Sequence, residues 1–164
     1  MKGLVLLLVV VCAACAGGWQ APSTSAGVDA HKEVVRRFYE AYNQGNWDAL
    51  DALVAPGYVH RTPSTEVDLA AFKQAGGSVR AGMPDYRITV EEIIADGNRV
   101  AVRLTGRGTH RGSFYGEPAT GRSVVSHGMV IHRLEHGRIV KGWELSDMHP
   151  SFQELGAVGE RGEL

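Results

Sequence analysis

The sequence contains only two cysteines, and both, Cys12 and Cys15, lie among its first sixteen residues. The rest of the chain therefore has no cysteine for a disulfide, a thiolate metal site or a nucleophile. The HxH and HExxH spacings of metal sites and the G-x-S-x-G motif of α/β-hydrolases are also missing. His127 and His132 differ by five positions, which puts them on opposite faces of a strand. We expect no metal and no other cofactor.

An excess of charge of one sign is also lacking. Seventeen Lys and Arg residues balance eighteen Asp and Glu residues, which leaves a net charge of −1 without a long charged run. Binding of nucleic acid requires a clustered basic surface, so we expect no nucleic-acid partner. The 164 residues, 44% hydrophobic and 21% charged, are typical of one globular domain.

The apolar run Leu4–Val11 is too short to span a bilayer. It follows Lys2 and precedes small residues, which is the order of a signal peptide. Ala13-Ala14-Cys15 resembles the lipobox of bacterial lipoproteins, in which the cysteine is lipidated. The alternative is ordinary cleavage after Ala14-Cys15-Ala16, which would leave a secreted or periplasmic protein. We expect an exported cell-envelope lipoprotein, with Cys15 as the modified residue.

The chain divides into four parts by composition. Residues 1–16 are the expected signal peptide, and residues 17–28 are small and polar, as in a flexible tether. Residues 29–158 form the expected domain, and residues 159–164 form a tail.

Helical signals dominate the first half of the domain. Asp29 can N-cap a helix that ends at Gln44, and Asn46 can cap a short helix over residues 47–54. Ser64 or Thr65 can start a third helix, which Pro84 closes.

The second half shows the alternation of β-strands. Residues 86–94 and 99–110 alternate, and a three-residue loop over residues 96–98 would set Ile94 opposite Val100. Two further apolar runs, Val124–Leu134 and Arg138–Leu145, flank a hairpin turn at His136-Gly137. Helices followed by such strands predict an α+β fold. We expect a curved antiparallel sheet of at least four strands, wrapped around the helices as a cone with a ligand cavity.

The register of the last hairpin predicts a site. If Glu135 pairs with Arg138, then Leu134 faces Ile139, Val130 faces Trp143, and Met129 faces Glu144. His127 and Glu144 then become diagonal neighbours on one face, which we expect to line the cavity.

Glu144 and His127 are the predicted catalytic residues. Burial should raise the pKa of Glu144 toward the working pH of a general base. Glu144 could instead be a structural carboxylate paired with Arg103, Arg107 or Arg133, and His127 could merely orient it. Asp147 falls on the opposite face in this register, where it would cap the C-terminal turn.

Five further residues are predicted to contact a substrate: His60, His110, Tyr42, Met129 and Trp143. His60 lies where the chain enters the cone, and His110 opens the loop that contains GEPATGR. The alternative for His60 is an ordinary surface position, and the alternative for Tyr42 and Trp143 is core packing.

Three segments resemble a known family: FYEAYNQGNWDALDALVAPGYVHRTP, MPDYRITVEEIIADGNRVAVRLTGRGTHRGSFYGEPATGR and HRLEHGRIVKGWELSD. They are similar to the SnoaL-like polyketide cyclases, or ester cyclases, of the nuclear-transport-factor-2-like superfamily, from about Val34 to Leu155. The resemblance implies a cone-shaped α+β barrel and ring closure on a polyketide ester by intramolecular aldol condensation. It also implies an acid/base residue beside the last-strand Trp, with a His nearby. The chain departs from the family in having Glu144 for the usual Asp, and Gly142 where a His is frequent.

Two functions of different classes follow. The first is cofactor-independent acid/base catalysis, either aldol cyclisation or isomerisation, on a small apolar carbonyl compound. The second is a non-catalytic envelope lipoprotein that binds a small ligand in the same cavity. The partners expected are a small apolar ligand or substrate, a membrane reached through the lipid anchor, and a second copy in a homodimer.

Overall fold

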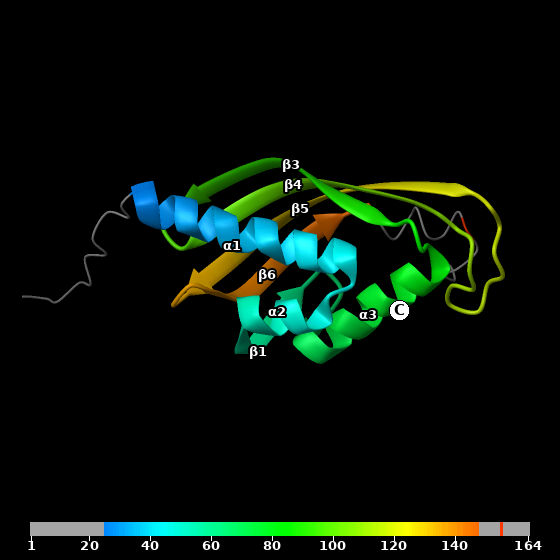
Figure 1. Cartoon of the computed structure of the whole chain (residues 1–164), viewed down its shortest axis with the longest axis horizontal. Coiled ribbons are helices and arrows are strands. Elements are labelled where there is room, and N and C mark those ends of the chain that lie inside the picture. Colours follow the sequence, from blue (N-terminus) through cyan, green and yellow to red (C-terminus); the bar gives the residue numbers. More distant parts are fainter. Residues whose placement is uncertain (1–24, 148–154, 156–164) are drawn as a thin grey trace, which may run out of the picture.

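The computed structural model describes residues 25–147 and Leu155, which form three helices and a six-stranded sheet. In chain order the elements are α1 Ser25–Gln44, α2 Trp47–Leu53, β1 Val54–Arg61, β2 Glu66–Asp68, α3 Leu69–Gly82, β3 Arg87–Asp96, β4 Arg99–Thr109, β5 Ser123–Glu135 and β6 Arg138–Ser146. Figure 1 shows α1 lying along the sheet. The predicted α+β class is confirmed. No helix in the described part is long and apolar enough to cross a membrane.

The strands are arranged in the order β2-β1-β6-β5-β4-β3. Strands β3 to β6 form the expected antiparallel sheet. β1, however, pairs in parallel with β6, so the sheet is mixed rather than wholly antiparallel. Its edge strands β2 and β3 do not pair with each other, and the sheet stays open.

The predicted second helix is confirmed, and its N-cap is Asn46, whose Oδ1 accepts a hydrogen bond from the backbone N of Ala49. The predicted starts of the other two helices are wrong. α1 begins at Ser25, which places Asp29 inside the helix. α3 begins at Leu69 because residues 66–68 pair with β1 as a strand, and Asp68 then caps the helix.

The loop between β3 and β4 has two residues rather than the predicted three, because Asp96 pairs with Arg99. Ile94 therefore lies opposite Ala101 and not Val100. A β-bulge between Val90 and Glu92 then shifts the register. The bulge returns Val90 to its predicted partner Leu104, so the shorter loop does not set apolar residues against charged ones.

The last hairpin has the predicted turn, with positive φ at His136 and Gly137, and it has the predicted pairs Glu135–Arg138 and Leu134–Ile139. The register beyond Leu134 was predicted wrongly. β6 carries one extra residue, Val140, because Arg133 pairs with Lys141. Glu144 consequently lies opposite Val130, and Met129 lies opposite Leu145.

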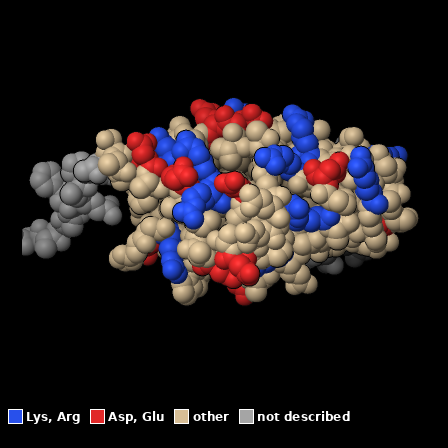
Figure 2. All heavy atoms as spheres, viewed as in Figure 1, with Lys and Arg blue, Asp and Glu red and all other residues tan. Residues whose placement is uncertain are grey.

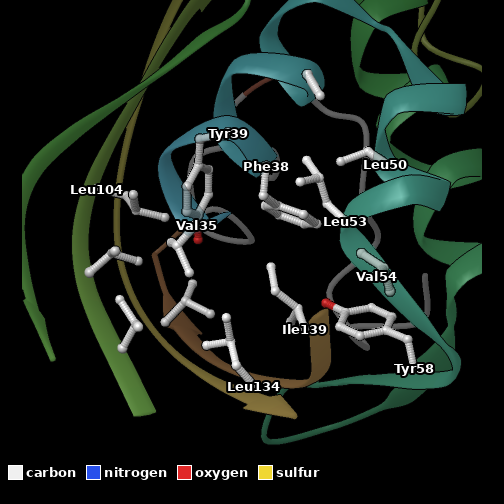
Figure 3. Packing of buried hydrophobic residues seen from close by; sticks show 14 residues of the cluster. Val35, Phe38, Tyr39, Leu50, Leu53, Val54, Tyr58, Leu104, Leu134 and Ile139 are labelled. Atoms are coloured by element: carbon white, nitrogen blue, oxygen red, sulfur yellow. The ribbon is translucent and has the colours of Figure 1, made fainter. Parts of the chain in front are cut away.

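The helices pack on one face of the sheet, called here the inner face. Figure 3 shows Phe38 and Tyr39 of α1 and Leu53 of α2 converging with Leu134 and Ile139 of the sheet. Full burial of such a side chain contributes about 1.5 to 3 kcal/mol. Of the described helices, none packs on the opposite face, which is called the outer face (Figure 1). Figure 2 shows acidic and basic side chains interspersed over the helix side of the molecule.

Candidate functional site

Glu144 and His60 form a hydrogen-bonded pair on the inner face. Nε2 of His60 lies 2.9 Å from Oε2 of Glu144. Glu144 belongs to β6 and His60 to the neighbouring strand β1, so the parallel β1–β6 pairing brings them together. The His60 side chain is 8% exposed and that of Glu144 is 21% exposed, so solvent still reaches the carboxylate.

Tyr58 extends this pair into a chain of three groups, since its Oη lies 3.0 Å from Nδ1 of His60. Tyr58 and His60 are two residues apart on one strand, so both point to the inner face. Burial, reinforced by the charge of Glu144, raises the pKa of Tyr58, so the phenol keeps its proton. When the phenol donates to Nδ1, Nε2 of a neutral His60 carries the hydrogen that is donated to Glu144.

Gly142 makes this arrangement possible because it is the cross-strand neighbour of His60 and lacks a side chain. A Cβ at position 142 would lie 2.9 Å from Nδ1 of His60 and 3.1 Å from Oη of Tyr58. Such contacts are too close for a larger residue to coexist with the observed His60 ring. The absence at position 142 of the His that is frequent in the family therefore has a steric reason in this chain.

The pKa of Glu144 is set by two opposing effects. Burial raises it, but the hydrogen bond and the electrostatic attraction of His60, together with a hydrogen bond from Ser146, outweigh burial and leave the pKa below its ordinary value. The expectation of a raised pKa was therefore wrong. Glu144 is ionised at neutral pH, which is the protonation state that a base requires.

A second buried pair lies beside the first. Nε2 of His132 is 2.8 Å from Oη of Tyr39, and His132 pairs across strands with Gly142. Burial, reinforced by the nearby charge of His60, lowers the pKa of His132 to about 3, so this ring is neutral. In the sequence, His132 stood out only as a possible metal ligand. Its partner Tyr39 could not be predicted, because a lone His in an apolar strand gives no local signal of a partner on a helix.

His127 does not lie near Glu144, and the predicted His127–Glu144 pair is wrong. The extra residue Val140 moves the pairing by one position, which places His127 on the outer face with 64% of its side chain exposed. Its Nδ1 lies 3.3 Å from Oδ2 of Asp147. Asp147 therefore pairs with His127 instead of lying on the face opposite it.

Met129 and Trp143 also lie on the outer face, whereas Glu144 lies on the inner face. Met129 is 55% exposed, and Nζ of Lys141 lies 5.0 Å from the centre of the Trp143 ring, a cation–π contact. A shallow open hollow of about 470 Å³ is found here. It is lined by Arg103, His127, Gly128, Met129, Leu145, Ser146 and Asp147. The face predicted to line an internal cavity is therefore a solvent-facing surface.

The remaining predicted site residues, His110 and Tyr42, are buried. His110 is fully buried, with its Nδ1 3.0 Å from Oγ1 of Thr120 and its ring against Phe114. Tyr42 packs edge-on against Trp47. These positions match the core-packing alternative for Tyr42 and make His110 an anchor of the loop over residues 110–122.

Two of the three arginines proposed as alternative partners of Glu144, Arg103 and Arg133, have other contacts. Nε of Arg103 lies 3.5 Å from Glu92, and a guanidinium nitrogen of Arg133 lies 3.1 Å from Glu135. Both pairs are solvent-exposed. Within the described residues, the basic side chain within 4 Å of the Glu144 carboxylate is that of His60.

The sequence matches the family model of the SnoaL-like polyketide cyclases over residues 32–155. AclR, a candidate hydroxylase from Streptomyces galilaeus, is 27% identical with a TM-score of 0.72, and the alignment covers 81% of this chain and 89% of AclR. IdmH, a candidate polyketide cyclase from Streptomyces antibioticus, is 32% identical with a TM-score of 0.69, over 77% of this chain and 98% of IdmH. A search of curated proteins found no match.

Proposed function

Because the chain belongs to the SnoaL-like polyketide cyclase family, we propose that it catalyses cofactor-independent acid/base chemistry on a small apolar carbonyl compound. The reaction is an aldol cyclisation or an isomerisation, and Glu144 is the base. The observation that carries this proposal is the inner-face carboxylate held by His60, which is itself held by Tyr58. The ligand would enter a cone-shaped pocket on the inner face.

In the cyclisation, the Glu144 carboxylate takes a proton from the carbon next to a carbonyl, which leaves an enolate. The enolate carbon attacks a second carbonyl of the same molecule, so that a carbon–carbon bond forms and the attacked oxygen becomes an alkoxide. The alkoxide recovers the proton from Glu144, and the proton balance closes without a cofactor. The hydrogen bond from His60 Nε2 keeps Glu144 oriented throughout these steps.

One observation favours the second function, a non-catalytic small-ligand-binding lipoprotein of the same fold. The pKa of Glu144 lies below its ordinary value rather than near neutrality. A general base is most effective when its pKa lies near the working pH. A carboxylate with a low pKa is also suited to accept a hydrogen bond from a bound ligand.

Exchange of an α-proton decides between the two functions. The chain would be incubated in D₂O with polyketide esters that carry an enolisable ketone, and deuterium incorporation and ring closure would be followed by NMR. We expect Glu144→Gln to lower the rate by about two to four orders of magnitude while ligand affinity is retained. Glu40→Gln is the control, because Glu40 is an exposed glutamate of α1.

Wild-type exchange that persists unchanged in Glu144→Gln would remove Glu144 as the base. A wild-type chain that binds these esters without exchange or ring closure would instead establish the ligand-binding function.

We also propose that the protein is exported and anchored to a membrane by a lipid on Cys15. The support is the order of Lys2, the apolar run and Ala13-Ala14-Cys15 in the sequence, which lies outside the described residues. Mass spectrometry of the mature N-terminus tests this proposal. We expect a diacylglycerol on Cys15, and an unmodified chain that begins near Gly17 would contradict it.

A further inference from the structure

A second hydrogen-bonded pair of side chains, formed by two hydroxyl groups, lies on the inner face. Oη of Tyr86, which directly precedes β3, is 3.0 Å from Oγ of Ser126 in β5. Both residues are 3% exposed, and the Tyr86 ring packs among apolar side chains of α3 and of the loop over residues 110–122. Hydroxyl groups are costly to bury in such surroundings unless their hydrogen bonds are made. The pair therefore calls for an explanation beyond core packing.

Strand β4 is shaped to accommodate this pair. Tyr86 reaches across β4 to Ser126, and it passes over Gly106, the cross-strand neighbour of Ser126. A Cβ at position 106 would overlap Oη of Tyr86 and would lie 2.6 Å from Oγ of Ser126. A Cβ at Gly108 would lie 3.0 Å from the Tyr86 ring. The two glycines therefore leave the space in which the hydroxyl groups meet.

One hydroxyl hydrogen of the pair has no acceptor in the described part of the chain. Tyr86 and Ser126 each carry one such hydrogen, and the bond between them uses only one of the two. If Ser126 donates to Oη of Tyr86, the phenol hydrogen is left for another acceptor. Buried donors are nearly always paired, so an acceptor oxygen brought by a ligand is a fitting partner.

Tyr86 is kept protonated by its surroundings. Burial raises its pKa, the hydrogen bond from Ser126 lowers it, and the negative charges of Glu144 and Asp147 raise it further. The net shift is upward, so Tyr86 is a hydrogen-bond donor at neutral pH. The effect of Glu144 also means that the two side chains are near enough to interact electrostatically.

Small residues separate the hydroxyl pair from the Glu144 carboxylate. Ser146, which donates a hydrogen bond to Glu144, pairs across strands with Gly128. Ser126 lies two residues from Gly128 on the same face, so it is a diagonal neighbour of Ser146, at about 7 to 8 Å between Cα atoms. Neither Gly128 nor Ser146 has a bulky side chain. The side chains of β5 and β6 therefore leave a path for a ligand that contacts both the carboxylate and the hydroxyl pair.

We propose that Tyr86 donates its hydroxyl hydrogen to the ligand oxygen on which negative charge develops, and that Ser126 positions Tyr86 for this role. This inference rests on the proposed function, in which Glu144 removes a proton from the carbon next to a carbonyl. The electron pair of the broken C–H bond moves to the carbonyl oxygen, which becomes the enolate oxygen and accepts the hydrogen bond from Tyr86. A donor fixed before the reaction stabilises this charge at little cost in reorganisation. Tyr86 is thus a catalytic residue and Ser126 a positioning residue.

Exchange of the α-proton in D₂O, with the same polyketide esters, tests the role of Tyr86. Tyr86→Phe keeps the ring over Gly106 and removes the hydroxyl, so the exchange rate should fall by about 100-fold to 1,000-fold. Tyr115→Phe is the matched control, because it removes the hydroxyl of a tyrosine that is 47% exposed, and it should leave the rate unchanged. Exchange by folded Tyr86→Phe at the wild-type rate would overturn the proposal.

A bound ketone provides a readout that does not depend on catalysis. A carbonyl oxygen that accepts a hydrogen bond has its ¹³C resonance shifted downfield, so acetylnaphthalene labelled at the carbonyl carbon reports the contact with Tyr86. We expect the downfield shift in the wild-type chain to be lost in Tyr86→Phe and reduced in Ser126→Ala, in which the donor is present but no longer held. An equal shift in the wild-type chain and Tyr86→Phe would overturn the role of Tyr86. An equal shift in the wild-type chain and Ser126→Ala would overturn the positioning role of Ser126.

The two measurements distinguish failure of this inference from failure of the proposed function. A wild-type chain without exchange activity would remove the base role of Glu144, but the ketone resonance would still decide whether Tyr86 is a donor. Exchange that slows in Tyr86→Phe but not in Glu144→Gln would retain the donor and remove the base. A wild-type chain to which acetylnaphthalene does not bind at about 1 mM, the Kd of a weak complex, would overturn the inference.

Discussion

Nε2 of His60 and Oε2 of Glu144 lie 2.9 Å apart although 84 residues separate them in the chain. His60 is in the only strand that pairs in parallel with β6 in the described sheet, and Gly142 leaves the space that its ring occupies. The pair therefore depends on one strand pairing and one missing side chain.

The first prediction concerns the charge state of Glu144. His60→Gln removes the ring that lowers the pKa of Glu144 while burial, which raises it, remains, so the pKa should rise. NMR titration of the ¹³C-labelled carboxyl group measures this directly, and the acid limb of any pH–rate profile should move to higher pH with it. His127→Gln, on the outer face, should leave the titration unchanged. An equal shift in both variants would show that His60 has no special influence.

The second prediction concerns Gly142. Gly142→Ala brings a Cβ to 2.9 Å from Nδ1 of His60, so the ring must move and the Glu144 hydrogen bond should lengthen or break. We expect the pKa of Glu144 to rise and the proposed exchange activity to fall by at least about tenfold, which is part of the two to four orders of magnitude that a positioned base contributes. Gly77→Ala is the control, because nothing lies within 4 Å of its Cβ in helix α3. That change should be neutral or stabilising by up to about 1 kcal/mol. An unperturbed Glu144 titration in Gly142→Ala would refute the steric argument.

The third prediction compares two buried tyrosines of α1. Tyr39→Phe removes the 2.8 Å hydrogen bond to His132 and leaves a buried nitrogen without a partner, which should lower the free energy of unfolding by about 1 to 3 kcal/mol. Tyr42 packs edge-on against Trp47, and Tyr42→Phe keeps that ring contact. The free energy of unfolding should therefore change by less than about 1 kcal/mol. Urea unfolding measures both. Equal losses would show that the Tyr39–His132 bond contributes little.

The fourth prediction concerns acid stability. The pKa of His132 is about 3 in the folded chain and near 6.5 when unfolded, so the unfolded state binds the extra proton between these values. This contribution to stability is complete above pH 6.5 and is lost as pH falls toward 3, by roughly 3 to 5 kcal/mol in all. His132→Asn carries no titrating group and should lose this part of the slope. Urea unfolding from pH 7 to 5 provides the comparison, and identical slopes for the two chains would contradict the prediction.

Local signals in the sequence were sufficient for the fold class and for several elements. Asn46 has a side chain that caps a helix start, and Gly137 tolerates the positive φ of a tight turn, so α2 and the last hairpin turn could be placed from neighbouring residues alone. Alternating apolar residues likewise indicated the four antiparallel strands. Glu144 could be singled out because it follows Trp143, where the resemblance to the family implies an acid/base residue.

The partner of Glu144 was decided only by the tertiary structure. Alternation shows that a strand has two faces, but one extra residue, Val140, reverses which side chains share a face across the hairpin. His127 therefore faces outward, and Glu144 shares the inner face with His60 of β1 instead. The parallel pairing of β1 with β6 and the contact of Tyr39 with His132 join residues 82 to 93 positions apart. No local pattern encodes such pairings, because they form only when the helices and the whole sheet pack together to bury their apolar faces.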